Sequence, residues 1–502
     1  MAFLLGIDIG TSGTKALVCD LKGRVLSTAM GEHEIASPHP GWSEQDPQWW
    51  WRATIQAVRV VVRKAKVKAA DCKGIGLSGQ MHGSVFLSDD GPEEPRALRP
   101  ALLWNDQRTA AECEAIEKAA GGRRKLIGMV GNPALTGFTA PKILWVRDHE
   151  PEVYGRIAHV LLPKDYIRFR LTGAYATDLA GAAGTLLLDV ANRDWSQEAL
   201  QALDIPPEWM PRTHEGTAVT GTISDQAARQ TGLKAGIPVV GGGGDQAAQA
   251  VGVGAVVPGR VALTVGTSGV VFAPLASYAY EPEGRLHAFC HAAPGQWCFM
   301  GVMLSAAGSL QWYRDTLAPE IDFHSLLGEV ANTSPGSDGL LFLPYLSGER
   351  TPHPDPLARG AFVGLTVRHG RAHLTRAVLE GVAFGLRDSF EMIKQSEAGR
   401  EINEIRVSGG GARNPLWRQI LADVLQSPLT TVEAVEGAAY GAALLAGVGA
   451  GVWPNVEAAA DVVRTGDTIV PGDDAGRYDR VYDLYRSLYP TLKDTFAAIS
   501  EM

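Results

Sequence analysis

Short apolar runs that are rich in β-formers and end in glycine or polar residues recur along the whole chain. They include Phe3–Asp8, Lys73–Ser78, Ile237–Val240, Arg260–Val265 and Ile405–Ser408. Between these runs lie longer stretches whose apolar residues recur with the period of a helix that is buried on one face. Alternating strands and helices of this kind predict an α/β fold, in which ligands bind at the carboxyl ends of the strands.

Two of the predicted helices have clear signals. Asp46 followed by Pro47 is a strong helix start, because the carboxylate accepts from free backbone N–H groups and proline fits the first helical position. We expect that helix to continue to about Ala65. A second helix is predicted over 373–393, which carries a regular apolar face. The small-residue stretch Thr177–Thr185 is instead predicted to be a loop.

A four-residue turn occurs twice. Gly10–Gly13, with the sequence GTSG, joins the first strand to a returning strand, and Gly266–Gly269 repeats it in the second half. With 502 residues the chain is also too long for one core. We therefore expect a duplicated domain, with a first copy over residues 1–255 and a second over residues 256–502, and both turns aimed at one cleft between them.

Composition limits the class of protein. Charged residues make up 20% and hydrophobic residues 45% of the chain, which is ordinary for a soluble globular protein. The net charge of −9 argues against a nucleic acid or an anionic membrane as the main partner. The N-terminus lacks a signal-peptide pattern, no long apolar stretch is present and the five cysteines are scattered, so we expect a cytoplasmic protein with reduced thiols.

The most informative acid follows four consecutive glycines. Gly241–Gly244 come directly after a predicted strand, and Asp245 then opens a predicted helix. Glycines allow close approach to the backbone, and a carboxylate at this place is either a helix N-cap, worth ~1 kcal/mol, or a catalytic group. The residues alone leave both alternatives open.

Several enzyme classes lack their sequence signature here. The Gly10–Gly13 turn leads into a strand, whereas a dinucleotide fingerprint must open a helix. No GxxxxGK[ST] segment and no HExxH segment occurs in the sequence, which argues against a Walker-type NTPase and a zinc hydrolase. The remaining classes are a two-domain phosphoryl-transfer enzyme and an ATPase of similar architecture that serves as a binding or chaperone module.

The first GTSG turn suits a phosphate. Its backbone N–H groups and the hydroxyls of Thr11 and Ser12 can donate to phosphate oxygens, and we place Thr14 in the same site. Asp8, at the end of the strand before the turn, is placed to hold a hydrated Mg²⁺. Phosphoryl transfer needs such positioning and charge neutralisation, together with a base for the incoming hydroxyl, a role that Asp245 could fill.

Two polar clusters that follow strands resemble the walls of a small-polyol pocket. One contains Met81 and His82 between glycines, and the other contains Trp104 and Asn105. Each cluster combines groups that hydrogen-bond hydroxyls with an apolar surface, as small-molecule pockets do.

Two later segments add to the predicted second half. Gly409–Gly411 separate a strand from a helix that begins near Asn414, an arrangement that can hold a phosphate or nucleoside at a helix N-terminus. The helix predicted over Glu436–Ala443 has a face of small residues, for which close helix packing is the simpler interpretation.

Taken together, the motifs resemble those of the FGGY carbohydrate kinases, nearly from end to end. The likeness extends from Gly6 to about Gly447. The segments that carry it are GIDIGTSGTK (Gly6–Lys15), GWSEQDP (Gly41–Pro47), GFTAPKILWVRDH (Gly137–His149), GGGGDQAA (Gly241–Ala248), the second GTSG, GAFVGLTVRHGRAHLTRAVLEG (Gly360–Gly381) and SGGGARN (Ser408–Asn414).

The resemblance implies two actin-like, ribonuclease-H-like domains with a hinge, ATP and Mg²⁺ against the C-terminal domain and the sugar against the N-terminal one. It implies a catalytic base at Asp245 and a metal-side acid at Asp8. A homodimer is a family expectation. The remaining implied contacts are Met81, His82, Trp104, Asn105 and Gln246 for the sugar, Gly266 and Thr267 for the ATP phosphates, and Gly410, Gly411 and Asn414 for the adenosine.

Several segments are similar to those of the family members that phosphorylate D-xylulose. The implied reaction converts ATP and D-xylulose to ADP and D-xylulose 5-phosphate, with another ketose or polyol, such as L-ribulose or a pentitol, as the alternative acceptor. A glycerol-specific member would carry Arg–Glu in place of Met81–His82. The segments are GQMHG (Gly79–Gly83), LLWNDQR (Leu102–Arg108), GNPALTGFTAPK (Gly131–Lys142), LLPKDYIRFRLTG (Leu161–Gly173) and FLPYLSGERTPH (Phe342–His353).

Overall fold

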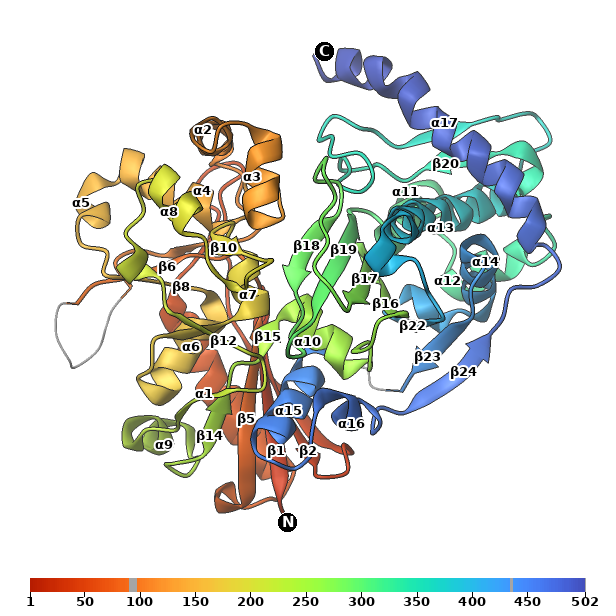
Figure 1. Ribbon diagram of the computed structural model, residues 1–502. Helices are drawn as coiled ribbons and strands as arrows, with labels where there is room; N and C mark the ends of the chain where they lie inside the picture. Colours follow the sequence, from red (N-terminus) through yellow and green to blue (C-terminus); the bar gives the residue numbers. More distant parts are fainter. Residues whose placement is uncertain (90–96, 434–436, 502) are drawn as a thin grey trace.

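The computed structural model describes residues 1–89, 97–433 and 437–501 (Figure 1). Its first half is built on a seven-stranded sheet with the strand order β13-β14-β5-β1-β2-β3, to which β15 adds by pairing with β5. The strands of this sheet are β1 (Phe3–Ile9), β2 (Gly13–Asp20), β3 (Val25–Glu32), β5 (Cys72–Gly79), β13 (Val219–Thr222), β14 (Pro238–Val240) and β15 (Gly243–Gly244).

The second half contains another seven-stranded sheet, in the order β18-β19-β17-β16-β22-β23-β24. Figure 1 shows the two sheets in separate halves of the molecule. The strands of the second sheet are β16 (Arg260–Val265), β17 (Gly269–Leu275), β18 (His287–Cys290), β19 (Trp297–Met303), β22 (Glu404–Ser408), β23 (Leu429–Val432) and β24 (Thr465–Ile469).

The two sheets share one topology. The order β3-β2-β1-β5-β14-β13 in the first corresponds to β19-β17-β16-β22-β23-β24 in the second. In both, the first two pairings are antiparallel, the next two parallel and the last antiparallel. Each GTSG turn joins the central strand to its antiparallel neighbour, so the internal repeat and the two-domain α/β fold predicted from the sequence are confirmed.

Short two-stranded sheets complete the strands. They are β4 (Glu44–Gln45) with β7 (Ala101–Leu102), β6 (Val85–Leu87) with β8 (His159–Leu161), β9 (Ala176–Asp178) with β12 (Arg212–His214), β10 (Leu188–Asp189) with β11 (Asp194–Trp195), and β20 (Leu341–Leu343) with β21 (Ala361–Val363).

The helices cover the sheets and the loops around them. In the first half they are α1 (Pro47–Lys64), α2 (Ala110–Ala119), α3 (Arg123–Val130), α4 (Thr139–His149), α5 (Pro151–Tyr154), α6 (Pro163–Thr172), α7 (Leu179–Ala183), α8 (Gln197–Ala202), α9 (Asp225–Thr231) and α10 (Asp245–Gly252). In the second half they are α11 (Ala307–Leu317), α12 (Phe323–Val330), α13 (Arg371–Gln395), α14 (Pro415–Leu425), α15 (Gly437–Gly449), α16 (Val456–Ala460) and α17 (Ala475–Ser500).

The two helices predicted from clear sequence signals form, but one segment predicted to be a loop contains a helix. The Asp46 side chain accepts from the backbone N–H of Gln48 at 2.9 Å and caps α1, as predicted, and α13 also forms. The prediction of a loop over Thr177–Thr185 is wrong. The Asp178 carboxylate accepts from the backbone N–H of Gly181 at 2.9 Å and starts α7, because the alanines that follow favour a helix once it is capped.

Helix α15 packs on the first sheet, although it lies late in the sequence. A Cβ at Gly6 or Gly76 would come within 1.8 Å of the carbonyl oxygens of Ala439 or Ala442, so only glycine permits this contact. The close packing predicted from the small-residue face is therefore confirmed; Glu436, the first residue of that prediction, lies outside the described residues. Figure 1 shows α15 beside β1 and β5.

Within the part of the chain that the structure describes, no helix has the length and apolar character needed to cross a membrane. All five cysteines are free.

Candidate active site

Asp245 lies where the first sheet meets the helix α10. The four glycines before it run along β5, where Gly243 pairs with Ser78 and Gly244 with Gly79. At Gly242 φ is +70°, and a Cβ there would come within 1.8 Å of the carbonyl oxygen of Leu77. The turn therefore needs glycine both for its left-handed backbone and for its close approach to β5.

The N-cap alternative for Asp245 does not match the geometry. Helix α10 begins at Asp245 itself, and the N-cap position is occupied by Gly244. The Asp245 carboxylate accepts from the backbone N–H of its neighbour Gln246 at 2.8 Å, whereas an N-cap side chain accepts from an N–H two or three residues on. The carboxylate is therefore available for other chemistry.

Asp8 and Asp245 lie in one electrostatic environment. Burial raises the pKa of Asp8, although the Ser78 hydroxyl and the charge of Lys15 oppose that shift. Burial, followed by the negative charge of Asp8, raises the pKa of Asp245 to about 7. Asp245 is thus poised to take a proton near neutral pH, as a general base must.

The surroundings of Asp8 fit a hydrated divalent cation. Its Oδ1 atom is buried and has no hydrogen-bond partner among the described residues. Carboxylate oxygen is a ligand that Mg²⁺ prefers, and this ion keeps most of its water and binds through one or two carboxylates and substrate phosphates. Within the described residues no group of three or more His, Cys, Asp and Glu side chains is placed to enclose a metal.

The Met81–His82 loop lies against the glycine turn that precedes Asp245. A Cβ at Gly244 would come within 2.6 Å of the Met81 side chain, so the loop and the turn are in direct contact. His82 Nδ1 lies 2.6 Å from the carbonyl oxygen of Gly184 and must donate to it, which leaves Nε2 as an acceptor. Burial lowers the pKa of His82 to about 3, so the ring is neutral and suits a sugar hydroxyl.

Two residues that the sequence did not single out hold this loop. His82 has a φ of +70°, a strained value for a residue with a side chain. Its carbonyl oxygen accepts from the Thr139 hydroxyl at 2.9 Å and from Lys142 Nζ at 3.4 Å. Lys142 is fully buried and also donates to the carbonyl oxygen of Phe138 at 2.9 Å. A lysine between the small or apolar residues 139–141 and 143–146 was the available signal.

The other residues expected at the sugar lie nearby. Trp104 is 38% exposed, and its indole N–H donates to the Thr11 hydroxyl at 3.0 Å. This contact joins the loop that carries Trp104 and Asn105 to the first GTSG turn. Asn105 is exposed beside Trp104, and Gln246 is half-buried beside Asp245.

The residues of the first phosphate turn differ in exposure. Ser12 is exposed and Thr11 half-buried, while the backbone N–H of Gly10 donates to the carbonyl oxygen of Gly13 at 3.0 Å and closes the turn. Thr14 lies in β2 and is fully buried, with no hydrogen-bond partner for its hydroxyl among the described residues.

The start of α11 holds the second phosphate turn. The backbone N–H groups of Ala306 and Gly308 donate to the carbonyl oxygen of Thr267 at 2.8 and 3.1 Å, and that of Ala307 donates to Gly266 at 2.8 Å. The carbonyl groups of Gly266 and Thr267 are therefore used by the start of α11, while the N–H group of Gly266 donates to the carbonyl oxygen of Ser268 at 3.0 Å and closes the turn.

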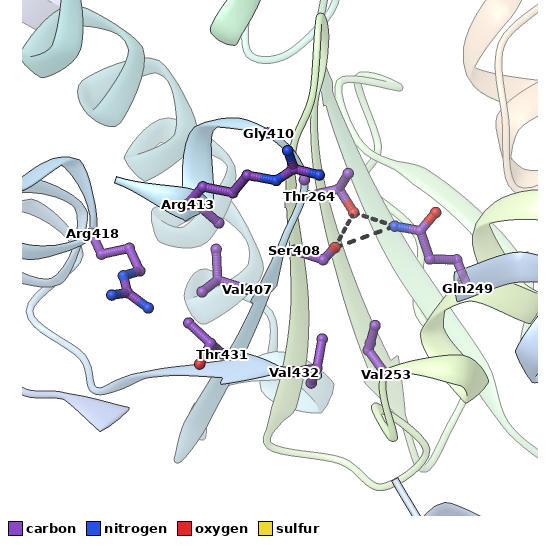
Figure 2. A pocket seen from close by; sticks show the side chains of 13 residues that line it. Gln249, Val253, Thr264, Val407, Ser408, Gly410, Arg413, Arg418, Thr431 and Val432 are labelled. Atoms are coloured by element: carbon purple, nitrogen blue, oxygen red, sulfur yellow. Dashed lines mark hydrogen bonds between the residues drawn. The ribbon is translucent and has the colours of Figure 1, made fainter. Parts of the chain in front are cut away.

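Two cavities meet at the residues expected near adenosine. Gly410 lines both a cavity of about 440 Å³, which Figure 2 shows, and another of about 610 Å³. Gly411 and Asn414 line the larger one together with Trp417. Asn414 Oδ1 accepts from the backbone N–H of Trp417 at 3.0 Å and caps α14, which leaves the Asn414 amide N–H₂ group for a ligand.

Figure 2 also shows a polar cluster that the sequence did not reveal. Gln249 Nε2 donates to the Thr264 hydroxyl at 2.6 Å and lies 3.4 Å from the Ser408 hydroxyl. Gln249 is one helical turn after Asp245 on α10, so it joins this helix to the second sheet. The spacing of four residues between Asp245 and Gln249 could have indicated a shared helix face.

Comparison with known proteins gives two family matches that together span most of the chain. Residues 3–252 match the N-terminal domain of the FGGY family of carbohydrate kinases, and residues 261–450 match its C-terminal domain. The curated xylulose kinase of Escherichia coli K12 is 44% identical over 447 residues, which cover 89% of this chain and 90% of that protein.

Solved structures of sugar kinases are similar to this chain over almost its whole length. The crystal structure of xylulose kinase from Rhodospirillum rubrum is 33% identical, with a TM-score of 0.91, covering 99% of this chain and 100% of that one. The crystal structure of gluconate kinase from Lactobacillus acidophilus is 26% identical, with a TM-score of 0.92 and 99% coverage of both chains. One fold therefore serves kinases whose names give different substrates.

Proposed function

The chain belongs to the FGGY family of carbohydrate kinases, and we propose that it transfers the γ-phosphoryl group of ATP to D-xylulose, giving D-xylulose 5-phosphate. The observation that carries the proposal is the contact between the glycine turn before Asp245 and the Met81–His82 loop, since a Cβ at Gly244 would come within 2.6 Å of the Met81 side chain. That loop carries a neutral imidazole, and burial raises the pKa of the Asp245 carboxyl to about 7. The identity to curated xylulose kinases supports the choice of sugar.

Asp245 acts as the general base. Its carboxylate takes the proton of the terminal hydroxyl of the sugar as that oxygen bonds to the γ-phosphorus and the bond to the bridging oxygen of ADP breaks. Its raised pKa matches a base that works near neutral pH.

Asp8 acts on the phosphate side. Asp8 would hold a Mg²⁺ ion, which would supply positive charge against the charge on the phosphate oxygens. The buried Oδ1 atom of Asp8, which has no hydrogen-bond partner among the described residues, supports this assignment.

The sugar and the nucleotide are held by different halves of the chain. The loops with Met81, His82, Trp104 and Asn105 supply the sugar contacts from residues 1–255. The turn at Gly266–Thr267 and the cavities at Gly410, Gly411 and Asn414 hold ATP from residues 256–502, with Gln249 reaching across. We further propose a cytoplasmic location and a homodimer, both as family expectations.

A sugar panel tests the acceptor. ADP release is measured with saturating ATP and Mg²⁺ against D-xylulose, L-ribulose, pentitols, glycerol and gluconate. D-xylulose should stimulate ADP release far above every other acceptor and above slow hydrolysis without sugar. Stronger stimulation by L-ribulose, a pentitol or gluconate would replace the acceptor, and ATPase activity indifferent to every sugar would favour a binding or chaperone module.

A further inference from the structure

Four charged side chains lie completely inside the first half of the chain. Lys164, Asp165 and Arg168 of α6 and Asp178 at the end of β9 are each at most 1% exposed. Lys164 Nζ forms ion pairs with both carboxylates, and Arg168 lies 3.4 Å from Asp165. Two positive and two negative charges thus form one neutral group, which we call the buried charge network.

Burying such a network lowers the stability of the fold relative to apolar side chains in the same place, so we expect it to have a role that apolar side chains could not fill. Taking charges out of water has a large penalty, and well-packed hydrophobic residues often give equal or greater stability than a buried ion pair. The network has no member among the residues expected to contact sugar or ATP. Its role therefore depends on the backbone groups that its two ends contact.

One end of the network holds the turn that carries Asp245. Arg168 Nη1 donates to the carbonyl oxygen of Val240 at 2.6 Å, and Nη2 donates to that of Gly241. Nη1 also donates to the Thr220 hydroxyl at 2.6 Å. These carbonyls end β14 and begin the glycine turn, which has no side chains of its own to fix its path, so the rigid guanidinium supplies the missing restraint.

The other end holds the loop that carries His82. The Asp178 carboxylate caps α7 through the backbone N–H of Gly181 at 2.9 Å. Directly after α7, the carbonyl oxygen of Gly184 accepts from His82 Nδ1 at 2.6 Å. The position and tautomer of the His82 ring thus depend on a short helix that Asp178 anchors. Helix α7 also packs against β15, the last strand before Asp245.

We propose that the buried charge network is a positioning device that sets the catalytic carboxylate of Asp245 and the sugar-binding ring of His82 relative to each other. Arg168 restrains the first and Asp178 the second, and Lys164 with Asp165 links the two. The proposal rests on the roles of Asp245 and His82 in the proposed function. None of the four side chains is a catalytic residue, because none touches the reacting atoms.

The Arg168 end is tested by Arg168→Lys, which keeps the charge but replaces the planar fork, whose two terminal nitrogens reach Val240, Gly241 and Thr220, with a single nitrogen atom. A displacement of about 1 Å at a reacting group can cost on the order of 10²-fold. We expect kcat to fall roughly 10- to 100-fold with the sugar KM within a few-fold of wild type, and hydrogen exchange of the amides of 241–246 to rise. A kcat equal to that of wild type would overturn the proposal.

The Asp178 end is tested by a pair of neutral variants. Lys164→Met with Asp178→Ala removes one charge of each sign together with the cap, and should raise the sugar KM about tenfold while kcat at saturating sugar changes little. Lys164→Met with Asp178→Asn keeps the capping oxygen and should recover part of the lost sugar affinity, because the cap returns while the link through Lys164 stays broken. An unchanged sugar KM in the first variant, or no rescue in the second, would overturn the proposal.

Arg376→Lys is a matched control for lost stability. Arg376 is 6% exposed and donates to Glu380 at 2.7 Å, to the carbonyl oxygen of Thr333 at 2.7 Å and to the Tyr478 hydroxyl at 2.9 Å. It therefore resembles Arg168 but contacts neither active-site loop. It should lower the unfolding temperature without changing kcat or the sugar KM.

The outcomes separate this proposal from the substrate assignment. If wild type does not phosphorylate D-xylulose, the assignment fails, and the variants are measured with the acceptor that the panel identifies. If wild type is active and Arg168→Lys or the Lys164→Met/Asp178→Ala pair behaves as wild type, the positioning proposal alone fails. If Arg168→Lys does not fold, the neutral pair, which removes no net charge, decides the proposal.

Discussion

Replacing Asp245 by asparagine should make the enzyme almost inactive and, at the same time, more stable. Asparagine keeps the oxygen that accepts from the Gln246 N–H, so the turn and α10 have no reason to change. It cannot take a proton from the sugar. General-base catalysis is worth roughly 10²–10⁴-fold, so we expect kcat to fall by at least that factor.

The gain in stability follows from the pKa. The pKa of Asp245 rises from an ordinary value of 3.8 to about 7 in the folded protein. Between these values the folded protein holds a proton that the unfolded chain has lost, so the carboxylate costs increasing stability as pH rises, up to about 4 kcal/mol above pH 7. Because Asp245 is only partly buried, water screens part of this cost, and we expect about 1–3 kcal/mol from its removal.

Urea unfolding at pH 5 and pH 8, without ATP or Mg²⁺, measures this difference. Asp245→Asn should be more stable than wild type at pH 8, and the advantage should shrink to about a third at pH 5. Asp46→Asn is the matched control, since asparagine caps α1 as well as aspartate does, and it should leave turnover and stability near wild type. Near-normal turnover of Asp245→Asn, or equal stability at pH 8, would refute the reasoning.

Three further predictions concern the other groups of the site. His82→Ala should raise the sugar KM about tenfold, because it removes about one hydrogen bond to the sugar, and it should leave the affinity for ATP unchanged. A sugar titration and an ATP titration of the same variant check this. Asp8→Asn should raise the Mg²⁺ concentration needed for half-maximal rate more than tenfold, measured by Mg²⁺ titration at fixed ATP, and an unchanged requirement would remove Asp8 from the metal site. Thr264→Asp should weaken ATP binding at least tenfold in a direct titration, because it adds a carboxylate beside the expected path of the phosphates, whereas the uncharged Thr264→Asn should weaken it less.

Much of the fold could be predicted because its signals are local. Asp46 with Pro47 marks a helix start, and the two GTSG turns mark equivalent hairpins, since in each case neighbouring residues determine the backbone. The wrong prediction at Thr177–Thr185 missed a local signal, since Asp178 caps α7 and alanines follow it. The contact that holds Asp178 is with Lys164, fourteen positions away, and this contact leaves no trace in the local pattern.

The candidate site shows the same division. Asp8 lies near the end of β1, Asp245 follows β15 directly and His82 comes three residues after β5, so their place at the carboxyl ends of strands was predictable. Thr139 and Lys142 were not singled out, because they act through the carbonyl oxygen of His82, a backbone group that the sequence does not reveal.

The structural repeat explains why an acid precedes the first GTSG turn but not the second. In the first sheet Asp8 of β1 lies opposite Ser78 of β5, and in the second Thr264 of β16 lies opposite Ser408 of β22. The two sites thus correspond residue by residue, with a hydroxyl in place of the carboxylate. Asp8 already raises the pKa of Asp245, and a third carboxylate would repel both of them and the triphosphate. A neutral Thr264, hydrogen-bonded to Gln249, avoids that repulsion and still connects α10 to the nucleotide side.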